Sequence, residues 1–193
     1  MKQFILVSFM LALGFYSSAQ KLSRPLHVYD TLPDMTLQMV NYPSQTVQLN
    51  EFRGKLLILD FWSIWCANCI EEFPKIAVLQ ERYKDEIMIL PIGFQSSWAD
   101  GIRRFYDRRN EKGIPLNIPS AIQDKSKGDT VLNNLFPSQA IPLLVWVDFR
   151  GQIMGVTSQH ALNAETIEGY LRSQRVVESN MKELEESHKK GLD

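Results

Sequence analysis

The stretch that decides the fold is Asp60-Phe61-Trp62-Ser63-Ile64-Trp65-Cys66-Ala67-Asn68-Cys69. It continues a nearly uninterrupted apolar run that begins at Leu56, which is typical of a strand buried on both faces of a sheet. From about Ala67 to Tyr83, apolar side chains then recur at helical spacing. The sequence therefore predicts a central strand, a turn that carries two cysteines, and a helix that packs on the sheet.

Cys66 and Cys69 are the two cysteines of this chain of 193 residues, and they form a C-x-x-C motif at the expected start of the helix. There Cys66 faces free backbone N–H groups and the positive end of the helix dipole, which favour thiolate over thiol. Cys69 lies one turn further on the same helix face and can attack a mixed disulfide formed at Cys66. We expect Cys66 to be the nucleophile and Cys69 the resolving thiol of a redox disulfide.

Other uses of the cysteine pair stay open at this point. A structural disulfide would close a very small loop and constrain the unfolded chain little. Zinc prefers four ligands, and the sequence has no second C-x-x-C and three scattered histidines, His27, His160 and His188. A copper-delivery module could use the two thiolates as soft ligands, although it usually needs a third. We expect no metal and no bound organic cofactor.

Two acids near the cysteines are candidates for proton transfer. Asp60 lies in an otherwise apolar strand, where burial raises the pKa of a carboxyl group, and we expect it to exchange a proton with Cys69. The alternative is a partly solvated aspartate at the end of the strand. Glu72 follows Cys69 by three residues, so it either shares that helix face and assists Asp60 or occupies a solvent-facing position near the helix start.

The remaining sequence predicts an α/β fold with a mixed sheet. The expected elements are a β-hairpin (35–40 and 46–49), the strand and helix described above (56–62 and 67–83), a strand that Pro91 shortens (87–92), a helix (98–109), an extended segment (117–122), a short helix (130–136), a second hairpin (143–147 and 152–157) and a closing helix (164–171). An order of β-α-β followed by β-β-α implies a mixed sheet flanked by helices on both faces.

The chain resembles the thioredoxin-like proteins, specifically the exported disulfide reductases of the TlpA and ResA type. The resemblance covers about residues 32–171 and is carried by Phe61-Trp62 and Trp65 before the first cysteine, Pro74 after the second, Ile141-Pro142 before a strand, and Phe52-Arg53-Gly54-Lys55. It implies a thioredoxin-like mixed sheet with an N-terminal β-hairpin extension. It also implies the activity of a thiol-disulfide oxidoreductase that reduces protein disulfides.

The resemblance assigns a substrate-binding site as well. Ile141-Pro142 is similar to the family's cis-proline site, where the backbone beside the dithiol pairs with an extended substrate segment. The alternative is an ordinary trans-proline that opens a strand. Trp65 is the aromatic residue of the cysteine segment that we expect to be exposed for substrate docking, whereas Phe61 and Trp62 belong in the core.

The direction of disulfide exchange depends on the residues between the cysteines. Ala67-Asn68 replaces the Gly-Pro that is common in thioredoxins, and neither residue is a cation that would stabilise the Cys66 thiolate strongly. This favours a reductant over a strong oxidase. A peroxiredoxin is the rival enzyme: Ser63 fits the spacing of its hydroxyl residue, but Leu59 stands where that class typically has proline.

Residues 1–19 have the layout of a secretory signal, with Lys2 followed by an apolar stretch over 4–16 and Ser17-Ser18-Ala19 as the cleavage site. The apolar stretch is shorter than the roughly 20 residues that span a bilayer. We therefore expect cleavage near Ala19 and a periplasmic or secreted product rather than one tethered by an uncleaved N-terminus. The expected domains are 20–172, thioredoxin-like, and 173–193, a charged helix or tail.

The expected partners follow from charge and from the resemblance. The formal net charge is −1, which predicts binding neither to nucleic acid nor to an anionic membrane. The resemblance implies disulfide-containing exported proteins as substrates and a membrane thiol-disulfide donor as the source of electrons. We expect the protein to act as a monomer.

Overall fold

The computed structural model describes residues 24–95, 101–124, 131–138 and 140–190. The predicted signal at 1–19 lies outside these residues, as do residues 98–100 and 130 of two predicted helices. Within the described ranges, no helix is both long enough and apolar enough to cross a membrane.

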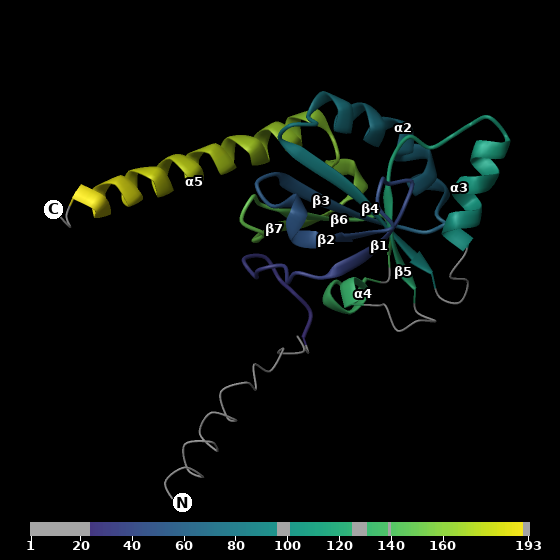
Figure 1. The fold of residues 1–193 in the computed structure, drawn as a ribbon, viewed down its shortest axis with the longest axis horizontal. Coiled ribbons are helices and arrows are strands. Elements are labelled where there is room, and N and C mark those ends of the chain that lie inside the picture. The colour runs from purple at the N-terminus through teal and green to yellow at the C-terminus, as the bar shows by residue number, and fades with distance from the viewer. Residues whose placement is uncertain (1–23, 96–100, 125–130, 139, 191–193) are drawn as a thin grey trace, which may run out of the picture.

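A seven-stranded mixed sheet in the order β2-β1-β5-β4-β3-β6-β7 forms the centre of the fold (Figure 1). The strands are β1 (Thr36–Val40), β2 (Thr46–Gln48), β3 (Leu56–Trp62), β4 (Ile87–Gln95), β5 (Ser120–Asp124), β6 (Leu143–Val147) and β7 (Ile153–Ser158). The helices are α2 (Ala67–Arg82), α3 (Gly101–Glu111), α4 (Val131–Leu135) and α5 (Ala164–Lys190), with 3₁₀ turns η2 (Leu49–Phe52) and η4 (Gln159–Ala161). β3 pairs in parallel with β4 and antiparallel with β6, so the predicted central strand and mixed sheet are confirmed.

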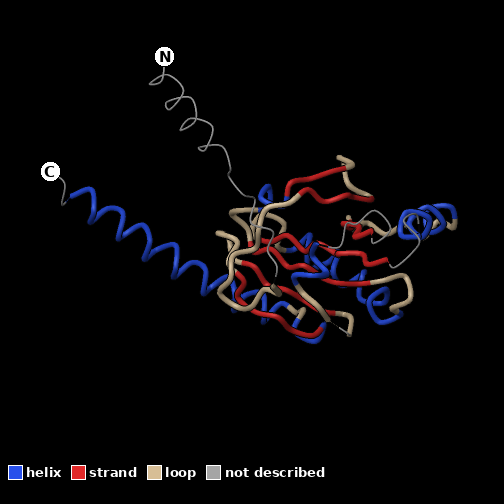
Figure 2. The backbone as a smooth tube through the Cα atoms, turned by 90° about the horizontal axis from the view of Figure 1, so that it is seen from below, coloured by secondary structure: helices blue, strands red, loops and turns tan. Residues whose placement is uncertain are grey.

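The sheet separates two apolar cores because β3 is buried on both faces. Ile58 and Trp62 face the core that also contains residues of α2, α3 and α5. Leu57 and Leu59 point the other way, into a core that the N-terminal segment and α4 close. Figure 2 shows the strands between helices and the long α5 running out from the body of the domain.

The prediction that Pro91 shortens its strand is wrong, since β4 runs through the proline to Gln95. Pro91 lies opposite Asp60 of β3, and pairing of β4 with β5 begins one residue later, at Ile92. The missing backbone donor therefore falls where the second ladder has not yet started, and it disrupts the sheet little.

The closing helix is much longer than the expected 164–171. α5 runs unbroken from Ala164 to Lys190, so the expected boundary between residues 172 and 173 lies inside one helix. Both predicted hairpins are confirmed: β1 pairs antiparallel with β2, and β6 with β7.

Candidate active site

The two cysteines lie directly after β3, at the N-terminus of α2. Cys66 is the N-cap residue of this helix, and its Sγ accepts a hydrogen bond of 3.2 Å from the backbone N–H of Cys69. The two sulfur atoms are joined, so the structure shows the oxidised form. After reduction, the same helix end places Cys66 beside N–H groups and the positive end of the dipole, which stabilise a thiolate.

The two cysteine residues differ in their exposure to solvent. Cys66 is partly exposed, whereas Cys69 is 1% exposed and packs in the core with Trp62 and Phe73. A protein disulfide or an external thiol can therefore reach Cys66, while Cys69 is shielded by the helix and the sheet.

Asp60 is the acidic residue of β3, the strand that leads to the two cysteines. It shares a strand face with Ile58 and Trp62, the face that α2 covers. The residue is 3% exposed, and its Oδ1 has no hydrogen-bond partner in the described part of the chain. Burial raises the pKa of Asp60 to about 7, and the negative charge of Glu72 adds to the shift. The alternative of a solvated aspartate at the strand end does not match this burial.

Glu72 lies one turn after Cys69 on α2, and its side chain is 26% exposed. Its Oε2 forms an ion pair of 2.9 Å with Nζ of Lys75. Glu72 is nevertheless close enough to Asp60 for its charge to raise the Asp60 pKa. The fold thus brings the two predicted acids near each other, with Asp60 buried and Glu72 partly exposed.

Of the three aromatic residues that precede Cys66, one is exposed and two are buried, as predicted. Trp65 is 86% exposed, whereas Phe61 and Trp62 are buried. Trp65 therefore offers an apolar surface next to Cys66. Trp62 packs in the core under α2, and Phe61 packs in the core on the other face of the sheet.

Ile141 and Pro142 reach the same edge of the sheet from the other end of the chain. The peptide bond between them is cis. Leu143, the next residue, pairs with Phe61 near the end of β3, so Pro142 lies at the edge where β3 leads into the cysteine turn. Ile141 is 38% exposed. The site is therefore assembled from two segments about 75 residues apart.

Sequence reasoning missed a hydrogen-bond network under the site. Trp62 donates from Nε1 to Oγ of Ser120 at 2.9 Å, and that hydroxyl lies 3.0 Å from the Pro91 carbonyl oxygen. The Trp62 ring also packs edge to face on Phe73 of α2, with 4.9 Å between centroids. No local signal marks Ser120, because its role arises when β5 pairs beside β4.

The metal-binding alternatives require further ligands beside the two sulfurs. Among the described residues, no group of three or more His, Cys, Asp and Glu side chains could hold a metal ion. Cys69 lies in the apolar core with Trp62 and Phe73, and Cys66 packs against this core.

Comparisons with known proteins agree with this geometry. A family model described as Redoxin matches residues 27–90. The thiol-disulfide oxidoreductase ResA of Oceanobacillus iheyensis is 28% identical over 148 residues, 75% of this chain and 71% of the relative. The thioredoxin-like protein YneN of Bacillus subtilis is 31% identical over 126 residues, 64% of this chain and 67% of YneN.

A solved structure supports the fold independently. The thioredoxin domain of a thiol-disulfide oxidoreductase from Bacteroides vulgatus matches with a TM-score of 0.56 at 20% identity, covering 77% of this chain and 97% of that domain. The thioredoxin-like fold that the sequence predicts is thereby confirmed. With its C-x-x-C pair at the start of α2 and with these relatives, the chain belongs to the thioredoxin-fold thiol-disulfide oxidoreductases of the TlpA and ResA type.

Proposed function

We propose that the protein is an exported reductase of protein disulfides that cycles Cys66 and Cys69 between dithiol and disulfide. The observation that carries this proposal is the partly exposed Cys66 at a helix N-terminus, bonded to the buried Cys69. An exposed nucleophile paired with a shielded resolving thiol suits an enzyme that must capture a substrate and then release it.

The reaction has two exchange steps. The Cys66 thiolate attacks one sulfur of a substrate disulfide, which forms a mixed disulfide and expels a substrate thiolate that takes up a proton. Cys69 then loses its proton and attacks Sγ of Cys66, which releases the second substrate thiol and leaves the Cys66–Cys69 disulfide. Two electrons pass from the dithiol to the substrate, and a membrane thiol-disulfide donor restores the dithiol.

Asp60 is proposed to accept the Cys69 proton in the second step. Its pKa of about 7 allows the buried carboxyl to take and return a proton near neutral pH. Glu72, the more exposed of the two acids, is proposed to connect Asp60 to water.

Trp65, Ile141 and Pro142 are proposed to bind the substrate. The exposed Trp65 supplies apolar contact area, and the backbone at Ile141 leads into β6, where an extended peptide can pair beside the cysteines. One chain supplies all of these residues, and the enzyme is proposed to act as a monomer.

Export is proposed from the N-terminal pattern, with 1–19 as a cleaved signal, 20–172 as the catalytic domain and 173–193 as a C-terminal extension. The product is periplasmic or secreted, where disulfide substrates persist.

The test combines a redox titration with an activity assay. The Cys66–Cys69 couple is equilibrated with glutathione, and insulin-disulfide reduction is measured for the wild type, Cys66→Ser and Cys69→Ser. We expect a potential below that of glutathione, no activity in Cys66→Ser, and a trapped mixed disulfide in Cys69→Ser. A potential well above that of glutathione would contradict the reductase, and a lack of any exchange would contradict thiol chemistry at this pair.

A further inference from the structure

The second half of α5 projects away from the sheet (Figures 1 and 2). Up to Gln174 the helix packs on the domain, since Leu171 and Gln174 are 4% and 5% exposed. Beyond that point, Val177, Met181 and Leu184 recur at a spacing of four and three residues, which places them on one side of the helix. Met181 is 37% and Leu184 68% exposed, so this apolar side is largely uncovered.

A cavity of about 250 Å³ lies where the projecting half leaves the domain. Its lining includes Tyr29, Phe149, Arg150, Met154, Gln174 and Val177. This volume lies at the lower end of the range for ligand pockets and has room for one large side chain. The Gln174 side chain is buried in the wall, and its Oε1 has no hydrogen-bond partner among the described residues. A rotation of this amide can present either a donor or an acceptor to an occupant.

Arg150 joins the cavity to the apolar side of the helix. Its guanidinium stacks over the Phe149 ring at 5.4 Å, pairs with Asp148 at 2.7 Å, and brings Nη1 to 4.0 Å from Sδ of Met181. The cavity and the side chains of Val177, Met181 and Leu184 therefore form one continuous surface, which we call the docking surface.

The projecting half gains little stability from its own domain. An isolated helix of this length is marginal in water, and apolar packing normally supplies the missing stability. A bound segment that covers the docking surface would supply it.

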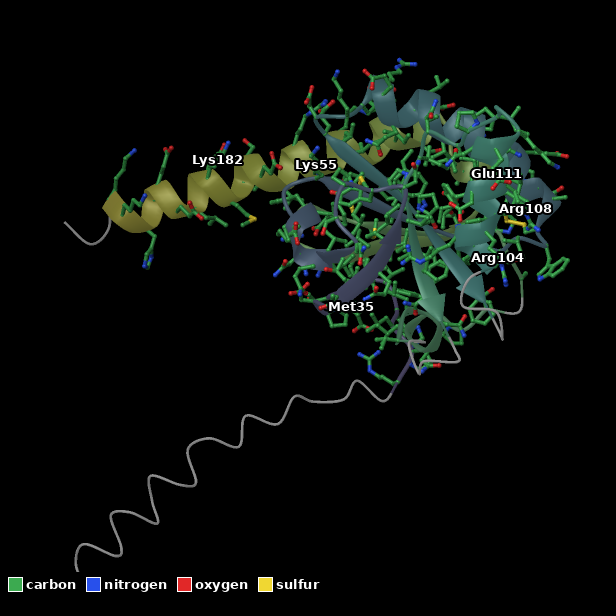
Figure 3. All side chains as sticks on the ribbon, turned by 45° about the vertical axis from the view of Figure 1, so that its right-hand side comes forward. Met35, Lys55, Arg104, Arg108, Glu111 and Lys182 are labelled. Atoms are coloured by element: carbon green, nitrogen blue, oxygen red, sulfur yellow. A yellow bond between two sulfur atoms is a disulfide. The ribbon has the colours of Figure 1, made fainter. Side chains whose placement is uncertain are left out.

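The charges beside the apolar side chains select the kind of partner. Beyond Gln174 the helix carries four glutamates, Glu178, Glu183, Glu185 and Glu186, and four cations, Arg175, Lys182, Lys189 and Lys190, of which Arg175 pairs with Glu86 and Lys182 is labelled in Figure 3. The glutamates are concentrated between residues 178 and 186, next to the apolar side chains. Glu178 and Glu185 directly follow Val177 and Leu184 and flank the apolar side. A second copy laid antiparallel would bring these glutamates against one another, and such like-charge pairs are unfavourable. Lysine or arginine on the partner would pair with them instead.

We propose that the docking surface binds a basic amphipathic helical segment of a protein partner, with one aromatic side chain of that segment seated in the cavity. Lysine or arginine side chains of the segment pair with Glu178 and Glu185, and its apolar side covers Met181 and Leu184. The inference goes beyond the proposed reductase function and does not depend on it.

The test uses a synthetic amphipathic peptide of leucine and lysine that carries one tryptophan. Its binding to the full mature chain is followed by tryptophan emission and by amide chemical shifts. We expect a blue shift of the emission, shifts around Tyr29, Phe149 and 177–185, and affinity that falls with added salt. The double variant Met181→Gln and Leu184→Gln removes the apolar side chains without adding charge and should weaken binding at least about tenfold.

A matched control is Val78→Gln on α2, since Val78 is 68% exposed, as Leu184 is, but belongs to another surface. It should bind like the wild type, and thermal unfolding of all variants verifies that they fold. Equal binding to a peptide with glutamate in place of lysine, shifts confined to other surfaces, or equal affinity in the double variant would overturn the proposal. A dimer in sedimentation that the double variant abolishes would assign the surface to a second copy and overturn it as well.

Discussion

The fold keeps the carboxyl group of Asp60 protonated up to about neutral pH. Its burial disfavours the charged form, and the charge of Glu72 adds to this, which raises the pKa of Asp60 to about 7. In the unfolded chain the carboxyl has its ordinary, lower pKa. The folded state therefore binds the proton more tightly, and its stability falls as the pH rises between these two pKa values.

The change Asp60→Asn should remove this pH dependence. We expect the oxidised variant to be more stable than the oxidised wild type at about pH 8, by at most roughly 4 kcal/mol, and similar to it at about pH 4. Urea unfolding of both oxidised proteins at the two pH values measures the difference. An equal gain at both pH values would show that the effect does not come from ionisation of Asp60.

Access to the two cysteines predicts their reactivity after reduction. Iodoacetamide should modify the partly exposed Cys66 at least about tenfold faster than Cys69, because the attacking thiolate must be reachable. Mass spectrometry of peptides from briefly treated, reduced protein measures the two rates. Faster modification of Cys69 would reverse the roles proposed for the pair.

At the scale of single elements, α5 combines a buried half and an exposed half. Leu171 is 4% exposed in the core, whereas Leu184 is 68% exposed on the projecting half. We expect Leu171→Ala to cost about 2–4 kcal/mol and Leu184→Ala to change stability by less than ~0.5 kcal/mol. Because both variants replace leucine by alanine within the same helix, the difference in their stability does not arise from helix propensity. The urea unfolding midpoints of the two variants measure that difference. Equal losses would mean that the projecting half is packed in solution.

At the scale of the whole molecule, the N-terminal hairpin belongs to the domain and completes one of its cores. Leu37, Met39 and Val47 of β1 and β2 are at most 3% exposed and share a core with Leu59 and Leu90 of the central strands. β1 also pairs with β5, so the hairpin extends the sheet itself.

Removal of residues 24–50 should therefore prevent the rest from folding normally. The shortened chain would expose one face of the central sheet, and we expect loss of dispersed amide signals together with aggregation. Comparison of its proton–nitrogen spectrum with that of the mature chain tests this. A well-dispersed, monomeric spectrum would show that the extension is dispensable for the fold.

The sequence by itself determined the central strand, the helix that follows and the chemistry of Cys66 and Cys69. These follow from local patterns: burial on both strand faces, helical spacing and a C-x-x-C at a helix start act over a few neighbouring residues. The exposure of Trp65 and the position of Pro142 before a strand were also predicted, because the resemblance rests on short motifs. The strand through Pro91 was predicted too short, since the cost of a proline depends on where the neighbouring strand begins to pair.

The tertiary structure alone decided how these parts meet. It buried Asp60 beside Glu72, placed Ser120 against Trp62, and brought Pro142 to the edge of the cysteine turn. It also continued α5 beyond the sheet. Each of these outcomes depends on pairing and packing between segments far apart in the chain, and the free energy of such contacts is not encoded in any local pattern.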